Sequence, residues 1–270
     1  MDLTEYRASP FERRRASDLL RLMPISGRNA LDIGARDGYF SLLIADRFER
    51  VTALDLDEPK IEHPKIRCVK GDVAKMQFAE GSFDLVFCAE VLEYVNPSAL
   101  QTICQEMERI SNQKILIGVR YKQDLRVGRT TCFSCGGFNP PWGHVNSFNE
   151  QRCKDLFPHC KVEAISFVGV NRSKTNWLSA ALMDFAGNPY GTYQQKVTCI
   201  HCAQPLTPPP RRNVVQLVAT EFAFWSRKIT ELFLKPQGYW MHIVLRKMSD
   251  VPVERQSQLD PLNLHLNLRR

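Results

Sequence analysis

Short apolar runs alternate with segments of helical period from residue 29 to about residue 170. The runs predict strands at 29–33, 51–56, 66–69, 83–88, 114–119 and 162–170, and a seventh follows at 239–245. Apolar residues recur at helical spacing in 39–48 and in the stretch after Asn96-Pro97. Asn96 is typical of an N-cap, and Pro97 of a first helical position. Alternating strands and helices indicate an α/β fold, a doubly wound sheet that is mostly parallel and covered on both faces.

Two irregular segments interrupt this alternation. Residues 121–147 and 171–212 are rich in Gly, Pro and Cys, and we interpret them as insertions in a domain spanning 29–248. Ser147 and Glu150 form a capping box ahead of a short helix. Residues 213–234 are apolar but interrupted by charges, which predicts an amphipathic core helix. Residues 1–28 are expected to form an N-terminal helical segment, and 249–270 a flexible tail.

The composition is that of a globular protein, with 44% hydrophobic and 24% charged residues. No apolar run approaches the length of about eighteen residues that a membrane span needs, so a cytoplasmic location is expected. Residues 25–125 carry 13 Lys and Arg against 16 Asp and Glu, whereas residues 126–270 carry 18 against 9. The basic half is compatible with a polyanionic partner, an acidic small substrate or a solvated surface.

A nucleotide-binding pattern follows the first predicted strand. The strand delivers Asp32 and then a turn containing Gly34 and Gly38, which brings backbone N–H groups and a helix N-terminus towards a ligand. Arg36 stands where the dinucleotide fingerprint has its middle glycine, and no Gly-Lys-Ser/Thr is present for a triphosphate. Asp55 ends the second strand, and Asp72 follows the third. Two separate carboxylates suit a ribose and an adenine without phosphates.

These residues resemble the class I S-adenosylmethionine-dependent methyltransferases of the small-molecule, type 11-like group. The matching segments are Leu31 to Gly38, Asp55, Gly71-Asp72 and Gly81 to Val95. The resemblance implies a Rossmann-like methyltransferase fold of seven strands with a final antiparallel strand at 239–245. It also implies that Gly34 and Gly38 hold the methionine part of the cofactor, Asp55 its ribose and Asp72 its adenine. The segment Cys88-Ala89-Glu90 would lie beneath the sulfonium, and Arg36, a departure from the pattern, could meet the cofactor carboxylate.

Four of the nine cysteines form two Cys-x-x-Cys pairs, Cys132 with Cys135 and Cys199 with Cys202. Two such pairs make the closed thiolate set of a structural Zn²⁺ site, which here would join the two inserted loops over the substrate entrance. A redox pair is the alternative, but both pairs lie in irregular segments and not between a strand and a helix. His144 or His201 could replace one thiolate. The other cysteines fit small buried hydrophobic positions and are Cys68, Cys88, Cys104, Cys153 and Cys160.

His144 is the leading candidate for a general base or an acceptor-orienting residue, because imidazole titrates near neutrality and its loop borders the expected pocket. Glu90, Glu93 and Tyr121 are further candidates. Asn139-Pro140-Pro141-Trp142 matches the motif by which amino-methyltransferases hold a planar amine. In that family the motif follows the fourth strand, whereas here it follows the fifth, so we interpret it as a structural turn.

Together these features predict an S-adenosylmethionine-dependent methyltransferase that methylates an oxygen or nitrogen of a small molecule, with Zn²⁺ ordering a lid. The basic half hints at an acidic, sugar-linked or carrier-bound acceptor. An RNA or protein methyltransferase is an alternative, although no additional RNA-binding domain is evident. A non-catalytic binding protein that keeps the cofactor fold is another. The sequence does not define the oligomeric state.

Overall fold

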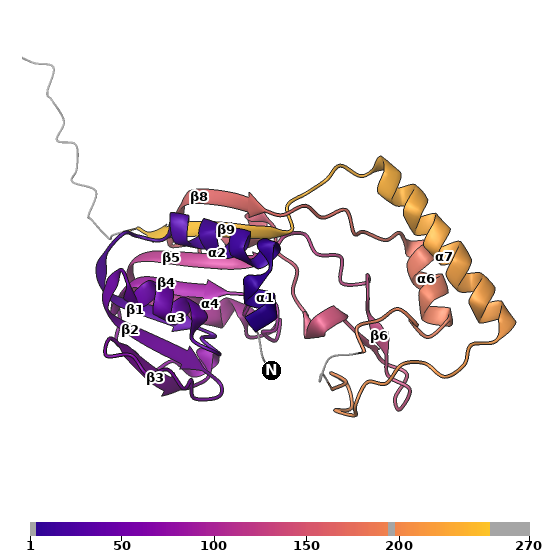
Figure 1. Cartoon of the computed structure of the whole chain (residues 1–270), viewed down its shortest axis with the longest axis horizontal. Coiled ribbons are helices and arrows are strands. Elements are labelled where there is room, and N and C mark those ends of the chain that lie inside the picture. The colour runs from indigo at the N-terminus through magenta and orange to yellow at the C-terminus, as the bar shows by residue number, and fades with distance from the viewer. Residues whose placement is uncertain (1–3, 194–197, 249–270) are drawn as a thin grey trace, which may run out of the picture.

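A computed structural model describes residues 4–193 and 198–248, and its largest element is a seven-stranded sheet (Figure 1). The strand order is β3-β2-β1-β4-β5-β9-β8. Their bounds are β1 Gly27–Ile33, β2 Phe48–Asp55, β3 Ile66–Lys70, β4 Phe83–Ala89, β5 Ser111–Arg120, β8 Cys160–Val168 and β9 Trp240–Lys247. β9 runs antiparallel to both β5 and β8, and the pairings among β1 to β5 are parallel. The predicted doubly wound sheet with one late antiparallel strand is confirmed.

Two hydrophobic clusters fill the two faces of this sheet. One contains Leu19 of α2 (Pro10–Leu22) and Ile44 of α3 (Tyr39–Ala45). The other contains Met107 of α4 (Leu100–Ile110) and Cys153 of α5 (Glu150–Leu156). The strands β1, β4 and β5 contribute side chains to both clusters. The apolar runs in these strands are therefore continuous.

Three helix ends differ from the sequence-based expectation. The helix expected at 39–48 ends at Ala45, because Phe48 already pairs in β2 and is buried there. The helix after Asn96 begins only at Leu100, since the Asn96 side chain caps the preceding turn at Ser98. The cap of α5 is Asn149, which accepts from the Arg152 N–H, and not the predicted Ser147.

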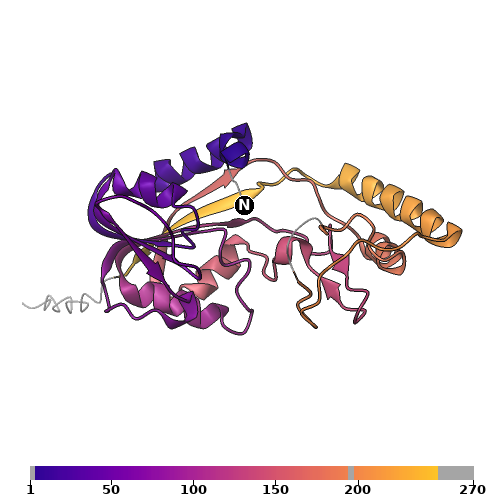
Figure 2. The ribbon, with the colours of Figure 1, turned by 60° about the horizontal axis from the view of Figure 1, so that its bottom comes forward.

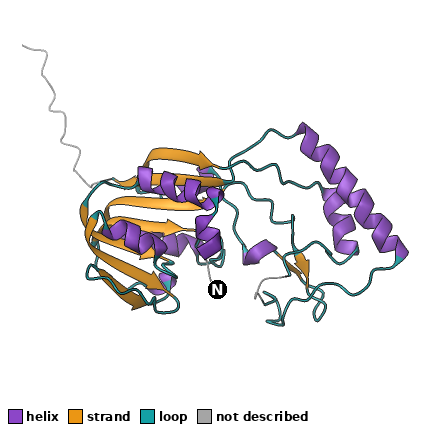
Figure 3. Cartoon of the chain, viewed as in Figure 1, coloured by secondary structure: helices purple, strands orange, loops and turns teal. Residues whose placement is uncertain are grey.

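The chain leaves the sheet twice to build a lobe, which we define as residues 122–145, 170–193 and 198–238 (Figures 1 and 3). Its elements are β6 Thr130–Thr131, β7 Phe138–Asn139, η2 Pro141–Gly143, α6 Trp177–Phe185 and α7 Val214–Phe233. The two helices pack against each other at the far end of the lobe (Figure 2). The remaining helical pieces are α1 Thr4–Ala8, beside α2, and η1 Val73–Lys75, after β3.

The helix expected at 213–234 is present as α7, but it is not a core helix. Only Ala219, Thr220 and Ala223 of α7 are buried. Its bulky apolar residues, including Phe222 and Trp225, face solvent. The spacing of apolar residues correctly predicted an amphipathic helix. The face of α7 that packs against the protein, however, carries its small residues and not its bulky apolar ones.

Within residues 4–193 and 198–248, no helix is long and apolar enough to cross a bilayer. The expected flexible tail, 249–270, lies outside the described residues.

Candidate functional site

A cavity of about 660 Å³ opens at the carboxyl ends of β1 to β4. Seven of the residues that the sequence assigned to cofactor binding line it, namely Asp32, Gly34, Arg36, Asp55, Asp72, Ala89 and Glu90. The eighth, Gly38, does not line the cavity but is the N-cap of α3. Parallel strands end at a common edge, so residues up to 58 positions apart in the sequence meet in one cavity.

The turn between β1 and α3 is held in a left-handed conformation. Gly34 and Gly38 have φ values of 77° and 78°, which glycine adopts without steric cost. Arg36 also has a positive φ, 47°, and its backbone N–H donates to Asp55 Oδ2 over 2.9 Å. The turn therefore keeps a glycine-like shape despite the arginine. Its backbone helps to orient the carboxylate at the end of β2.

Asp32 lies beneath this turn and is almost fully buried. Its Oδ2 accepts a hydrogen bond of 2.6 Å from the Ser41 hydroxyl. Burial raises the pKa of Asp32 to about 7, although the Ser41 hydrogen bond acts in the opposite direction. Asp72 instead caps η1 by accepting from the Ala74 N–H, and it stays at the cavity wall. The three acids of the site thus have different environments.

The N-terminal helices supply a part of the site that the sequence analysis missed. Tyr6, Arg7 and Arg15 line the cavity from α1 and α2. Arg15 is 3% exposed and pairs with Glu12 through Nη2 at 2.6 Å. Its Nη1 has no hydrogen-bond partner among the described residues and lies 3.8 Å from Glu90 Oε2. The i,i+3 spacing of Glu12 and Arg15 was visible in the sequence, but nothing local indicated that this pair would face the cavity.

Glu90 follows β4 with a φ of 56°, a strained value for a residue with a side chain. Its Oε1 accepts a hydrogen bond of 2.5 Å from Trp240 Nε1. Burial opposes ionisation of this carboxyl, but Arg15 and the Trp240 indole together hold its pKa below the ordinary value. A carboxylate is therefore aimed at the cavity from the end of β4.

Glu93 is fully buried behind the cavity. Its Oε1 accepts from the Arg120 N–H over 2.7 Å, and no residue that the structure describes donates to its Oε2. Its carbonyl accepts from the N–H groups of Val145 and Asn146, which ties the β4–α4 loop to the lobe. Burial, reinforced by the charge of Glu90, raises the pKa of Glu93 to about 8. The side chain is protonated at neutral pH and acts in structure.

The Glu93→Gln variant should unfold with a weaker pH dependence than the wild type. In the unfolded chain Glu93 ionises near its ordinary pKa of 4.5, whereas in the folded chain it keeps its proton to about pH 8. Between these values the native state holds one extra proton, so stability falls as pH rises, by of order 1 kcal/mol per pH unit. Glutamine cannot titrate and should remove this loss. Urea unfolding at about pH 6 and about pH 8 measures it.

Asp32 has the same sign of shift, so the Glu93→Gln variant should keep part of the dependence. Glu49→Gln is the control, because Glu49 is exposed at the start of β2. Parallel pH profiles for the wild type and the Glu93→Gln variant would contradict the assignment of a protonated Glu93.

His144 does not line the cavity but lies directly behind Tyr94, which does. The two rings meet edge to face with centroids 4.7 Å apart, and His144 Nδ1 lies 2.8 Å from Gln123 Oε1. An Nδ1–H that donates to this amide oxygen would leave Nε2 with its lone pair. Burial and then the Arg120 charge lower the pKa of His144 to about 4, so the ring is neutral at physiological pH.

Tyr121, another candidate catalytic residue, does not line the cavity. Its hydroxyl donates to Glu150 Oε1 over 2.7 Å, and the ring packs on Phe167. This position at the end of β5 joins α5 to the sheet. Its sequence position beside β5 suggested the site, but the strand turns the side chain towards α5.

The four cysteines of the two pairs meet inside the lobe. The four Sγ atoms all lie within 4.8 Å of one another, with Cys132 and Cys202 3.6 Å apart and Cys135 and Cys199 3.7 Å apart. A tetrahedral zinc with Zn–S bonds of about 2.3 Å requires sulfur atoms about 3.8 Å apart. The donor set and its spacing therefore fit a zinc ion.

The backbone around the cluster is also built to hold thiolates. The N–H of His201 donates to Cys199 Sγ over 3.4 Å, and the Asn139 side chain accepts from the Ile200 N–H. His201 Nε2 lies 3.0 Å from the Phe138 carbonyl, so this ring is engaged outside the cluster. Asn139 is buried and joins the two pairs, which agrees with a structural role for the Asn-Pro-Pro-Trp motif.

The sequence predicts that the other five cysteines are all buried, but two of them are not. Cys88, Cys104 and Cys153 are buried in the core, whereas Cys68 and Cys160 are partly exposed. Both exceptions lie on strands at the edges of the sheet, β3 and β8, where one flank has no neighbouring strand.

Comparisons with known proteins agree with this architecture. Residues 31–114 match the model of a methyltransferase domain. A malonyl-[acyl-carrier protein] O-methyltransferase from Legionella pneumophila is 30% identical over 108 residues, which are 36% of this chain and 37% of that protein. A ubiquinone biosynthesis O-methyltransferase from Dechloromonas aromatica is 33% identical over 103 residues, 34% of this chain and 44% of that protein.

The chain thus covers about two-fifths of the length of these relatives. The N-methyltransferase NodS from Bradyrhizobium japonicum superposes with a TM-score of 0.51 at 17% identity, covering 90% of this chain and 99% of that one. That likeness concerns the fold. Residues 31–114 are therefore similar to a methyltransferase domain, and the sheet that contains them has the Rossmann-like methyltransferase fold.

Proposed function

We propose that this protein binds S-adenosylmethionine in the cavity at the ends of β1 to β4 and transfers its methyl group to a small molecule. The observation that carries the proposal is the set of charged groups around the cavity. Asp55, at the end of β2, and Asp72, just after β3, line the cavity on one side, and Arg7 and Arg15 line it from α1 and α2. These charges suit a ligand with hydroxyl and amine donors at one end and a carboxylate at the other.

Each group then has a definite part in binding. Asp55, oriented by the Arg36 N–H, would accept from the ribose hydroxyls, and Asp72 from the adenine amine. Arg15, rather than the Arg36 side chain, would hold the carboxylate, because a buried guanidinium N–H without a partner is costly until a ligand satisfies it. When bound, the cofactor supplies a methyl group on a sulfonium, and Glu90 contributes a carboxylate beside it.

The acceptor would enter between the β4–α4 loop and the lobe. Arg120 and Trp142 lie there, with the guanidinium 5.5 Å from the indole centroid, and the Arg120 group also stacks on Tyr239 at 3.6 Å. The free Nε2 of His144 would accept the acceptor's proton after a movement of Tyr94. An arginine beside aromatic rings favours a planar or acidic acceptor. The O-methyltransferase names of the relatives support an oxygen acceptor.

We further propose that Zn²⁺ occupies the four-cysteine cluster as a structural ion. Four thiolates complete a tetrahedral set, so no position is left open for chemistry. Residues 139–144 run from the cluster to His144, so the metal would fix the segment that borders the acceptor entrance. The ion's part is therefore to order the lobe.

Calorimetric titration of the full chain with S-adenosylhomocysteine tests cofactor binding. We expect one site per chain, and the Asp55→Asn variant should bind about tenfold to a hundredfold more weakly because the charge-assisted hydrogen bonds to the ribose are lost. Asp46→Asn, at the turn between α3 and β2, is the matched control and should bind like the wild type. Absence of binding by the wild type would refute the proposed function.

A further inference from the structure

One face of α7 is a continuous stripe of exposed apolar side chains. It contains Val214, Val218, Phe222, Trp225, Ile229 and Leu232, which are between 49% and 81% exposed. Their spacing of three or four residues places them on one face of the helix along its whole length. We call this face the apolar stripe. Such a patch is unusual on a soluble surface and marks a site of interaction.

The helix is fixed with this stripe facing outward. On its other side the Ser179 hydroxyl donates to the Ala223 carbonyl over 2.8 Å, and Asn176 Nδ2 donates to Thr230 Oγ1 over 2.7 Å. These contacts use small and polar residues of α7 against α6. Turning the stripe inward would break them and place Trp225 where Ala223 now packs. The stripe is therefore a permanent outer surface of the lobe.

Cationic residues surround the stripe. Residues 211–235 contain five Lys and Arg but only two Glu. Glu231 pairs with both Arg227 and Lys228, and the exposed Arg211 and Lys235 stand at the two ends of the helix. The surface next to the stripe is consequently positive at both ends.

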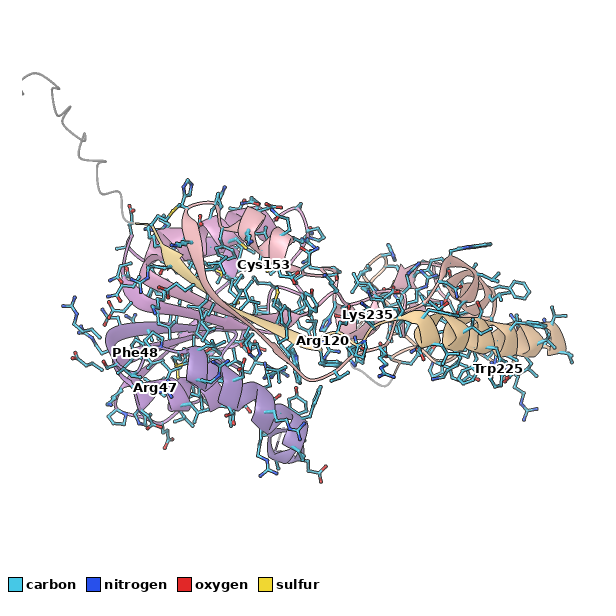
Figure 4. All side chains as sticks on the ribbon, turned by 90° about the horizontal axis from the view of Figure 1, so that it is seen from above. Arg47, Phe48, Arg120, Cys153, Trp225 and Lys235 are labelled. Carbon is cyan, nitrogen blue, oxygen red and sulfur yellow. The ribbon has the colours of Figure 1, made fainter. Side chains whose placement is uncertain are left out.

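The stripe shares one side of the molecule with α2. Figures 2 and 4 show α2 and α7 on the same side, and Figure 4 places Trp225 on that side of α7. α2 carries the exposed residues Arg13 and Arg14. This side of the molecule is elongated, with the apolar stripe at one end and α2, which carries exposed arginines, at the other.

We propose that this side binds the surface of a membrane containing anionic lipid, with the apolar stripe inserted at the headgroup boundary. An aromatic and aliphatic helix face flanked by cations is the arrangement that lies in such an interface. A second copy of the chain fits less well. Antiparallel pairing of two stripes would bring Arg211 against Lys235, and parallel pairing would bring each cation against its own copy. Anionic headgroups would neutralise these charges.

Flotation of the full chain with lipid vesicles tests this proposal. Vesicles of phosphatidylcholine containing about one-third phosphatidylglycerol should carry the protein, and pure phosphatidylcholine vesicles or high salt should carry much less. The double variant Phe222→Ser/Trp225→Ser should bind at least about tenfold more weakly. Arg211→Glu/Lys235→Glu should weaken binding to anionic vesicles only. Ile25→Ser, at an 88% exposed position before β1, is the matched control and should bind like the wild type.

Two results would overturn the proposal. One is a wild type that does not float with anionic vesicles. The other is a dimer in analytical ultracentrifugation that Phe222→Ser/Trp225→Ser dissociates while neither protein binds vesicles, which would assign the stripe to self-association. Circular dichroism should show that the variants are folded, because the substituted positions are exposed. Vesicle binding needs neither cofactor nor acceptor, so its outcome is independent of the proposed enzymatic function.

Discussion

The Gly34→Val variant is expected to lose binding of S-adenosylhomocysteine by more than about a hundredfold. A Cβ at Gly34 would lie 2.3 Å from Val91 Cγ2, and the φ of +77° is unfavourable for any β-branched residue. Both effects displace the turn in which the N–H of Arg36, two residues after Gly34, orients Asp55. The cofactor site would therefore lose its shape at the end of β1. Calorimetric titration measures the affinity, and circular dichroism checks the fold.

A control separates this local effect from the general cost of replacing a glycine. Gly81 also has a positive φ, +61°, but a Cβ there would meet only Asn112 at 3.5 Å, and Gly81 does not line the cavity. Gly81→Val should lower the melting temperature and leave the affinity unchanged. Adding Val91→Ala to Gly34→Val removes the colliding methyl group and should recover part of the binding. Wild-type affinity in the Gly34→Val variant would contradict the assignment of this turn to the cofactor.

The sheet was predictable because the apolar content of each central strand reflects how deeply that strand is buried. β1, β4 and β5 are covered on both faces, so their sequences are nearly continuous apolar runs. The cavity was predictable for a related reason, since Asp32, Asp55 and Asp72 stand at or just after strand ends and parallel strands end together. Local pattern and topology were enough for both.

Other parts of the site depend on packing between distant segments, which no local pattern records. Arg15 lines the cavity because α2 packs on the sheet beside Trp240. The Arg15 guanidinium lies 5.4 Å from the centroid of the Trp240 ring. The outward face of α7 was mispredicted because periodicity defines two faces of a helix without saying which one packs. Here α6 presents Asn176 and Ser179, polar partners that select the small polar face of α7.

The cofactor site and the cysteine cluster belong to different parts of the molecule, and this separation makes the zinc proposal testable. Within the described part of the chain, the residues that line the cavity all lie between Tyr6 and Ile103, whereas all four cysteines lie in the lobe. Loss of a metal ion should thus affect the lobe and leave cofactor binding in place. If loss of the metal ion abolished both the structure of the lobe and cofactor binding, the lobe would be needed to fold the sheet.

Cys199→Ser is accordingly expected to reduce bound zinc from one ion per chain to almost none and to unfold the lobe. Structural zinc sites bind with about 10–16 kcal/mol in small domains, far more than the short β6–β7 hairpin can supply by itself. Elemental analysis measures the metal. Hydrogen exchange should show loss of protection in the lobe but not in β1 to β5.

Cys68→Ser is the matched control for this experiment, because Cys68 is a partly exposed thiol on β3, outside the cluster. It should keep its zinc, the protection of the lobe and the affinity for S-adenosylhomocysteine. The Cys199→Ser variant should keep only the last of these, within about threefold, because its substitution lies outside the cavity. A wild type purified without zinc, or a Cys199→Ser variant with full zinc content, would contradict the assignment. Retained affinity in an unfolded lobe would show that the four thiolates order the acceptor side alone.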